Sequence, residues 1–232
     1  MRLLSWNVQG LGGAHCKKYK GRLWQDLNKC MVGGGLNIMM VQEHHLSDDR
    51  IRNYGSILKG KWQLYWSSVI GERQRKAGVC IAVVEKQMKN VVQYMEVIPR
   101  RAQCLVMRVE DEDVAFLNVY TPNYVSAKGD FWTELCLKLP NVNNWCVAGD
   151  SNMIENVEDR IGGSNVVVHR YELVEWEKLC IKLRMQDVWS LHNFVRMSNS
   201  LLFSRSDRKM MGSNLSRIDR IYVNDFMGGI GA

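Results

Sequence analysis

The segment Trp145-Cys-Val-Ala-Gly-Asp150-Ser-Asn152 carries the most information about this chain. Its apolar run, Cys146-Val-Ala148, is typical of a buried strand. The run ends in Gly149, which is followed by an acid and, two residues later, by an amide. A strand that ends in this way places a base and a hydrogen-bond donor at a sheet edge, where ligands usually bind. Asp and Asn are also common turn residues after strands, so this segment alone does not separate a catalytic site from an ordinary turn.

Two earlier strand ends carry polar residues of the same kind. Leu3–Val8 is typical of a strand and holds Asn7 among apolar neighbours, and Leu36–Gln42 is typical of a buried strand that ends before Glu43. A buried amide without a hydrogen bond costs about 1–3 kcal/mol, so Asn7 either satisfies a loop or binds a metal or phosphate. Glu43 is either an exposed loop residue or a Mg²⁺ ligand, because Mg²⁺ prefers one or two carboxylates with waters and phosphate oxygens.

Two later segments extend the series. One strand ends at Tyr120, and the Thr-Pro step that follows stops it. Tyr120 is either a half-buried strand residue or the donor of a phenolic hydrogen bond to an oxyanion, with Asn123 holding the phenol. Asp219 alternates with its neighbours in the last strand-like run and therefore points away from the face of Arg220. It is either a functional acid or one half of an ion pair with a nearby Arg.

The composition favours one large domain with its own core, since the chain has 232 residues of which 46% are hydrophobic. No repeat, low-complexity tract or linker divides the chain, and its longest apolar runs are too short to span a bilayer. A strand-like stretch begins at once, so we expect no leader peptide. The seven Cys lack a C-x-x-C spacing and the five His lack an H-x-x-x-H pair. We therefore expect reduced thiols, a nuclear or cytoplasmic location without secretion, and no zinc site.

The charge balance mildly favours a polyanionic partner. The formal net charge is +7, from 31 basic and 24 acidic residues. Many basic proteins bind no polyanion, and the basic residues between Arg196 and Arg220 are also explained by a solvated loop.

The periodicity of the remaining chain predicts a mixture of helices and mostly antiparallel strands. Helical spacing covers Lys17–Met31, Phe131–Leu139 and Tyr171–Leu183, and the second of these follows Gly129-Asp130. The further strand-like runs are Trp62–Ser67, Gly78–Val84, Val91–Ile98, Gln103–Glu110, Asp113–Tyr120 and Arg217–Val223. The short connections of the first five predict an antiparallel meander, and two packed sheets flanked by helices are the natural layered arrangement for this pattern.

The motifs taken in order resemble the endonuclease/exonuclease/phosphatase superfamily. The series is Trp-Asn-x-x-Gly from Trp6, Gln42-Glu43, Asn-x-Tyr-x-Pro-Asn from Asn118, Gly-Asp-x-Asn from Gly149, and Ser-Arg-Ile-Asp-Arg from Ser216. The series is most similar to the apurinic-endonuclease-like domain of LINE-type (non-LTR) retrotransposons. The resemblance runs from Leu3 to about Val223, and Asp187-Val-Trp189 and Phe203-Ser204 add to it.

The resemblance implies a four-layer α/β sandwich of two mainly antiparallel sheets flanked by helices, as a single domain over residues 1–232. It also implies Mg²⁺- or Mn²⁺-assisted phosphodiester hydrolysis with DNA as the partner. In a full-length protein a reverse transcriptase domain would follow. No membrane partner is implied.

The roles of the residues follow from the same resemblance. Glu43 would be the direct carboxylate ligand of the cation, and Asn7 would hold or orient that cation. Asp150 would orient or deprotonate the attacking water. Asn152 and Tyr120 would donate hydrogen bonds to the phosphoryl oxygens as charge develops.

The resemblance implies roles for three more residues, and the sequence differs from the family pattern in two places. Asn123 and Arg217 would contact the substrate, and Asp219 would brace a catalytic His from a later motif. Gln9 stands where many relatives carry a second acid, which would weaken cation binding. No Ser-Asp-His motif follows Asp219 before Ala232, and none of the five His lies in a position that this motif supplies. We therefore expect a domain truncated before its last strand, with impaired activity.

Two alternatives to a DNA endonuclease stay open at this point. The first is another phosphoesterase of the same superfamily that acts on an inositol phosphate, a lipid or RNA, because a fold does not fix a substrate. The second is a catalytically dead, nucleic-acid-binding remnant of a mobile element.

Overall fold

The structure is a computed structural model of the chain. It describes residues 1–11, 35–52, 61–68, 77–161, 170–188, 204–205, 215–216 and 218–224. The helix expected over Lys17–Met31 lies outside these residues, and so does Arg217. None of the helices in the described part is long and apolar enough to cross a membrane.

The first sheet has four strands, β1 (Leu3–Asn7), β2 (Ile38–Gln42), β3 (Trp62–Ser67) and β4 (Val79–Val84), in the order β1-β2-β4-β3. β1 and β2 are parallel, whereas β4 pairs antiparallel with both β2 and β3. All five residues of β2 are buried, which agrees with the four apolar residues that precede Gln42 in this strand.

The second sheet has six strands in the order β10-β13-β8-β7-β6-β5. Its members are β5 (Val91–Ile98), β6 (Ala102–Val109), β7 (Glu112–Tyr120), β8 (Asn144–Asp150), β10 (Gln186–Asp187) and β13 (Asp219–Val223). Only β7 and β8 are parallel neighbours among these described strands. A small third sheet joins β9 (Arg160–Ile161), β12 (Leu215–Ser216) and β11 (Ser204–Arg205).

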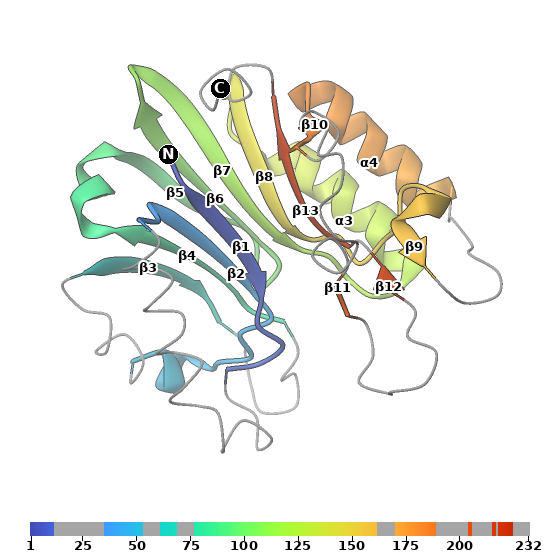
Figure 1. Cartoon of the computed structure of the whole chain (residues 1–232), viewed down its shortest axis with the longest axis horizontal. Helices are drawn as coiled ribbons and strands as arrows, with labels where there is room; N and C mark the ends of the chain where they lie inside the picture. The colour runs from blue at the N-terminus through green and yellow to red at the C-terminus, as the bar shows by residue number, and fades with distance from the viewer. Residues whose placement is uncertain are drawn as a thin grey trace.

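The two large sheets pack face to face, and two helices cover the outer face of the six-stranded sheet (Figure 1). The helices are α3 (Val125–Lys138) and α4 (Arg170–Leu183). Between the sheets, Met40 and Ile81 meet Leu105 and Phe116 in one apolar cluster. On the helix side, the rings of Trp132 of α3 and Trp176 of α4 lie 4.6 Å apart between centroids. These layers confirm the expected sandwich of two sheets with helices outside.

A polar contact joins the two sheets inside this apolar interface. Asn118 of β7 and Gln42 of β2 are both fully buried. The Asn118 amide donates to the carbonyls of Val41 (3.1 Å) and Cys80 (3.0 Å), and its oxygen accepts from Gln42 Nε2 at 2.7 Å. These buried hydrogen bonds of Asn118 fix one relative placement of the sheets, because any slip leaves the Asn118 amide unpaired.

Two elements differ from the sequence-based expectation. The expected five-strand meander is interrupted after β4, where the 3-10 helix η2 (Glu85–Asn90) carries the chain from one sheet to the other. Helix α3 begins at Val125, well before the expected Phe131, and contains Gly129. A Cβ on Gly129 would lie 2.2 Å from the ring of Tyr171 of α4, so this Gly serves close helix packing and does not mark a helix start.

Candidate active site

Five strands bring their polar termini to one edge of the sandwich. β1 and β2 are parallel, so Asn7 and Glu43 emerge side by side, and β7 and β8 are parallel, so Tyr120 and Asp150 do the same. β13 runs antiparallel to β8, and its first residue, Asp219, is the register partner of Asp150. Strand direction alone therefore gathers residues that lie far apart in the sequence.

Asn7 connects the two halves of the site. Its Nδ2 donates to Glu43 Oε1 at 3.0 Å and to Asp150 Oδ2 at 2.7 Å, while its Oδ1 accepts the backbone N–H of Gln9 at 3.0 Å. One amide thus holds a carboxylate from each sheet. In this arrangement Asn7 presents nitrogen to both carboxylates, so it orients Glu43 and leaves the oxygens of Glu43 as the cation ligands.

Glu43 is kept ionised by its neighbours. Burial acts to raise its pKa, but hydrogen bonds from His45, Asn7 and Tyr120 outweigh burial and lower the pKa below the ordinary value. His45 Nε2 lies 3.2 Å from Glu43 Oε2. His45 was not among the predicted site residues, because nothing in the local sequence separates it from the neighbouring His44.

His44 has a different environment from His45. Its Nε2 donates to the Ser67 carbonyl at 3.0 Å and its Nδ1 accepts the Leu46 N–H at 3.0 Å. Burial lowers the pKa of His44 to about 4 and keeps the ring neutral. His44 is therefore a satisfied core histidine.

The pKa of Asp150 is shifted in the opposite direction from that of Glu43. Burial and the charges of Asp219 and Glu43 raise the pKa of Asp150 to about 7, against hydrogen bonds from the Asn152 N–H and from Asn7. The Asn152 N–H donates to Asp150 Oδ1 at 2.8 Å. A carboxyl whose pKa lies near neutrality is suited to accept a proton, and two nearby acids with pKa values pushed apart are typical of acid–base sites.

Asn152 is held by side-chain and backbone contacts. Its Nδ2 donates to the Thr121 carbonyl at 3.0 Å, and its own carbonyl accepts Lys128 Nζ at 2.5 Å. The loop after β8 is thereby tied both to the end of β7 and to α3. Lys128 was not among the expected site residues.

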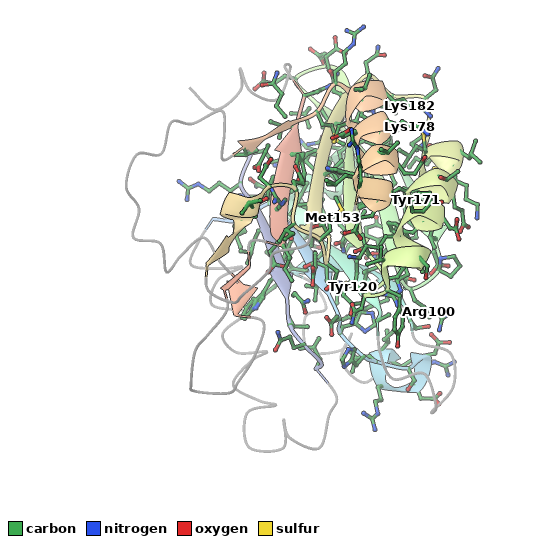
Figure 2. All side chains as sticks on the ribbon, turned by 90° about the vertical axis from the view of Figure 1, so that its right-hand side faces the viewer. Arg100, Tyr120, Met153, Tyr171, Lys178 and Lys182 are labelled. Carbon is green, nitrogen blue, oxygen red and sulfur yellow. The ribbon has the colours of Figure 1, made fainter. Side chains whose placement is uncertain are left out.

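The Tyr120 phenol lies beside the Glu43 carboxylate and under a cation. Burial and the charge of Glu43 raise the pKa of Tyr120, so the phenol keeps its proton and can donate it in a hydrogen bond. The Arg101 guanidinium carbon lies 4.6 Å from the Tyr120 ring centroid, and Arg101 Nη1 donates to the Thr121 carbonyl at 3.1 Å. Figure 2 shows Tyr120 and Arg100, the neighbour of Arg101, below the two helices.

The turns that form the site carry backbone strain. Gln9, Glu43, His45 and Asn152 have φ values of 49°, 54°, 56° and 47°, in the left-handed region that residues other than Gly rarely adopt. Such residues cost of order 1–3 kcal/mol each, and they cluster where function requires a fixed geometry.

Gly149 allows β7 and β8 to approach each other at the site. Its φ is +149°, and a Cβ on Gly149 would lie 1.9 Å from the carbonyl oxygen of Val119. Only Gly fits this position, which explains why a Gly precedes the acid in the motif that predicted the site.

The structure brings most of the expected residues together. Asn7, Glu43, Tyr120, Asp150 and Asn152 form one connected hydrogen-bonded group through the contacts given above. Asp219 lies at the same edge and is exposed, and Asn123 is exposed after the end of β7. The side chain of Arg217 lies outside the described residues.

The oxygen donors at this edge fit a hard divalent cation. No group of three or more His, Cys, Asp or Glu in the described part has a metal-binding arrangement. Glu43 is a half-buried, ionised carboxylate at the mouth of the site, and Mg²⁺ is commonly bound by one or two carboxylates with waters and substrate phosphate completing the shell. A single-carboxylate site of this kind agrees with the donor set.

The architecture is the endonuclease/exonuclease/phosphatase fold, in which polar strand ends from two packed sheets meet at one edge. Comparison with solved structures supports this assignment at low sequence identity. The AP endonuclease LMAP from Leishmania major superposes with a TM-score of 0.76 at 14% identity, over 97% of this chain and 79% of that chain. The Xenopus laevis APE2 catalytic domain gives 0.70 at 16% identity, over 99% and 84%.

A third similar structure holds DNA. The 3′ phosphatase NExo from Neisseria, bound to a product DNA hairpin, gives a TM-score of 0.67 at 17% identity, over 97% of this chain and 88% of that chain. No protein-family model matches this chain, and no curated protein matches its sequence significantly. This chain therefore shares its fold with these structures, and its own residues decide its activity.

Proposed function

We propose that this chain is a divalent-cation-dependent phosphodiesterase that cleaves DNA internally. One observation carries the proposal: the Asn7 amide holds Glu43 and Asp150, from different sheets, in one hydrogen-bonded group. The two acids have opposite electrostatic settings, with the pKa of Glu43 lowered and that of Asp150 raised to about 7. Phosphodiester hydrolysis needs one ionised cation ligand and one proton acceptor, and the two shifted pKa values supply one of each.

The chain's residues take distinct roles in the proposed reaction. Asp150 orients a water and accepts its proton while the water oxygen bonds to phosphorus and the bond to the leaving oxygen breaks. Tyr120 and the Asn152 amide group donate hydrogen bonds where negative charge develops on the phosphoryl oxygens. Glu43 would hold the cation, and Asn7 would orient the Glu43 carboxylate through its amide nitrogen. The cation, when bound, stabilises charge on the phosphate and on the leaving oxygen.

DNA is proposed as the substrate on the basis of charge and of one similar structure. The net charge of +7 favours a polyanion. The NExo structure holds a product DNA hairpin. Mg²⁺ or Mn²⁺ is proposed as the cation because the site offers oxygen donors.

We also propose that the domain derives from a LINE-type retrotransposon, and the ordered motif series supports this origin. A reverse transcriptase reading frame downstream of this segment in its gene would support that ancestry, and an unrelated downstream frame would count against it.

A plasmid-nicking assay tests the activity. Supercoiled plasmid is incubated with the wild-type chain, with Asp150→Ala, and with Asp130→Asn, an exposed carboxyl on α3 that serves as the control. We expect slow nicking with Mg²⁺ or Mn²⁺, in line with the impaired activity expected from the sequence, and none with EDTA. We also expect a loss of at least about 10²-fold in Asp150→Ala and no change in Asp130→Asn. Phosphate release from inositol phosphates without nicking would overturn DNA as the substrate, and cation-independent nicking would overturn the mechanism.

A further inference from the structure

A buried ion pair lies directly behind the catalytic edge. Lys128 of α3 and Glu172 of α4 have side chains that are 4% and 3% exposed, and Lys128 Nζ lies 2.8 Å from Glu172 Oε2. The other described ion pair on α3, Lys138 with Glu134, is about half exposed and links residues one helical turn apart. The pair of Lys128 and Glu172 therefore differs in burial and joins two separate elements.

The helices enclose this pair by packing closely. α3 and α4 lie side by side on the outer layer, and Tyr171 sits at the start of α4 facing α3 (Figure 2). The absence of a side chain at Gly129 lets the Tyr171 ring approach, since a Cβ there would lie 2.2 Å from that ring. Gly129 and Tyr171 directly adjoin Lys128 and Glu172 in the sequence, so the close helix packing and the buried pair lie at the same point along α3 and α4.

The ammonium group of Lys128 also reaches the catalytic loop. Nζ donates to the carbonyl oxygen of Asn152 at 2.5 Å. The N–H of Asn152 donates to Asp150 Oδ1, and its side-chain Nδ2 donates to the Thr121 carbonyl. With φ at 47°, Asn152 occupies a strained conformation that persists only where its surroundings hold it. Lys128 supplies the one charged donor among these contacts.

Stability alone gives no clear reason for this pair. A buried ion pair recovers its desolvation cost only with very good geometry, and well-packed apolar residues of similar volume are often equally stable or more so. Glu172 pairs with Lys128 in the interior, and the Lys128 ammonium group is directed at the backbone of the loop that carries Asn152 and orients Asp150.

We propose that Lys128, paired with Glu172, is a positioning residue that sets the Asn152 peptide and through it the Asp150 carboxyl. The proposal rests on the proposed function, because it assigns Lys128 a role in that same reaction. Loss of the Nζ contact frees the Asn152 carbonyl, so Asn152 leaves the left-handed conformation and its N–H moves off Asp150. A shift of about 1 Å in a reacting group typically lowers turnover about 10²-fold.

Three variants separate positioning from stability. Lys128→Met removes the ammonium but leaves Glu172 as an unpaired buried charge. Glu172→Gln leaves Lys128 unpaired. The double variant Lys128→Met/Glu172→Gln contains no unpaired buried charge and still lacks the donor to Asn152. Lys138→Met, at the exposed pair on the same helix, is the control.

Three measurements are made on each protein. Urea unfolding gives the midpoint, nicking kinetics give kcat and KM, and hydrogen exchange gives the protection of the Asn152 amide. We expect both single variants to lower the unfolding midpoint and the double variant to recover it. We expect kcat of Lys128→Met and of the double variant to fall about 10²-fold with KM nearly unchanged, and the Asn152 amide to lose protection in both.

The outcomes are decisive in either direction. A double variant that regains both the midpoint and kcat would show that Lys128 acts only on stability and would overturn the proposal. An Asn152 amide equally protected in wild type and in the double variant would overturn it as well. A wild-type chain without nicking activity would refute the proposed function, whereas the hydrogen-exchange comparison would still decide whether Lys128 holds Asn152.

Discussion

Replacing Asp150 with Asn should remove a pH-dependent destabilisation of the folded chain. Burial, Asp219 and Glu43 raise the pKa of Asp150 from 3.8 to about 7. Between these two values the unfolded chain has already lost the proton that the folded chain retains. The free energy of unfolding therefore falls as the pH rises through this window. The stability that proton retention by folded Asp150 provides at low pH is completely lost above about pH 7.

The size of the effect follows from the same two values. One pKa unit corresponds to about 1.4 kcal/mol, so the fall between pH 5 and pH 8 amounts to about 2–3 kcal/mol. Asp150→Asn cannot ionise and lacks this fall. The variant also loses one acceptor for the Asn7 amide or for the Asn152 N–H, but that cost is nearly independent of pH. The difference between wild type and variant is thus the informative quantity.

Urea unfolding at pH 5, 6, 7 and 8 in EDTA measures this difference. The free energy of unfolding of Asp150→Asn, relative to wild type, should rise by about 2–3 kcal/mol from pH 5 to pH 8, whereas the control Asp130→Asn should stay within about 0.5 kcal/mol of wild type. Parallel pH profiles for wild type and Asp150→Asn would refute the assignment of a near-neutral pKa to Asp150. Saturating Mg²⁺ should lower the pH at which the free energy of unfolding of the wild-type chain falls, because a nearby cation favours the ionised carboxylate.

Three further substitutions test separate parts of the site. Gly149→Ala should destabilise the chain by more than about 3 kcal/mol or prevent folding, because its Cβ would meet the Val119 carbonyl at 1.9 Å, and circular dichroism during thermal unfolding measures this effect. Glu43→Gln should abolish the stabilisation by Mg²⁺ or Mn²⁺ in a thermal-shift titration and leave the cation-free melting temperature close to wild type, and an unchanged titration would exclude Glu43 as the ligand. Tyr120→Phe should lower kcat for nicking about 10- to 10³-fold with little change in KM, because it removes a donor to the charged transition state, and a pure KM effect would assign Tyr120 to substrate binding instead.

The strands and the composition of the site were predictable because each depends on local pattern. Alternating or continuous apolar runs located β1, β2, β7 and β8 to within a few residues of their observed bounds. Polar residues directly after those runs identified the site edge, since parallel neighbours end at the same edge of a sheet.

Other features depend on tertiary contacts that no local pattern carries. The start of α3 was placed too late because Gly129-Asp130 has the composition of a helix start, whereas Gly129 lies inside the helix where α4 approaches. His45 belongs to the site only because the turn after Glu43 directs its ring back to that carboxylate. The partnership of Lys128 and Glu172 requires the packing of α3 on α4, which the separate helical periodicities do not specify.

The buried amide pair between the sheets bears on how this protein would lose activity on heating. Each sheet supplies half of the site, so the distance between Glu43 and Asp150 depends on how the sheets sit on each other, and Gln42 and Asn118 set that placement. Thermal loosening of this contact would separate the two acids while most of the apolar packing persists. The temperature at which activity is lost would then lie below the temperature of cooperative unfolding, and the interval between them would report the stiffness of the sheet–sheet interface.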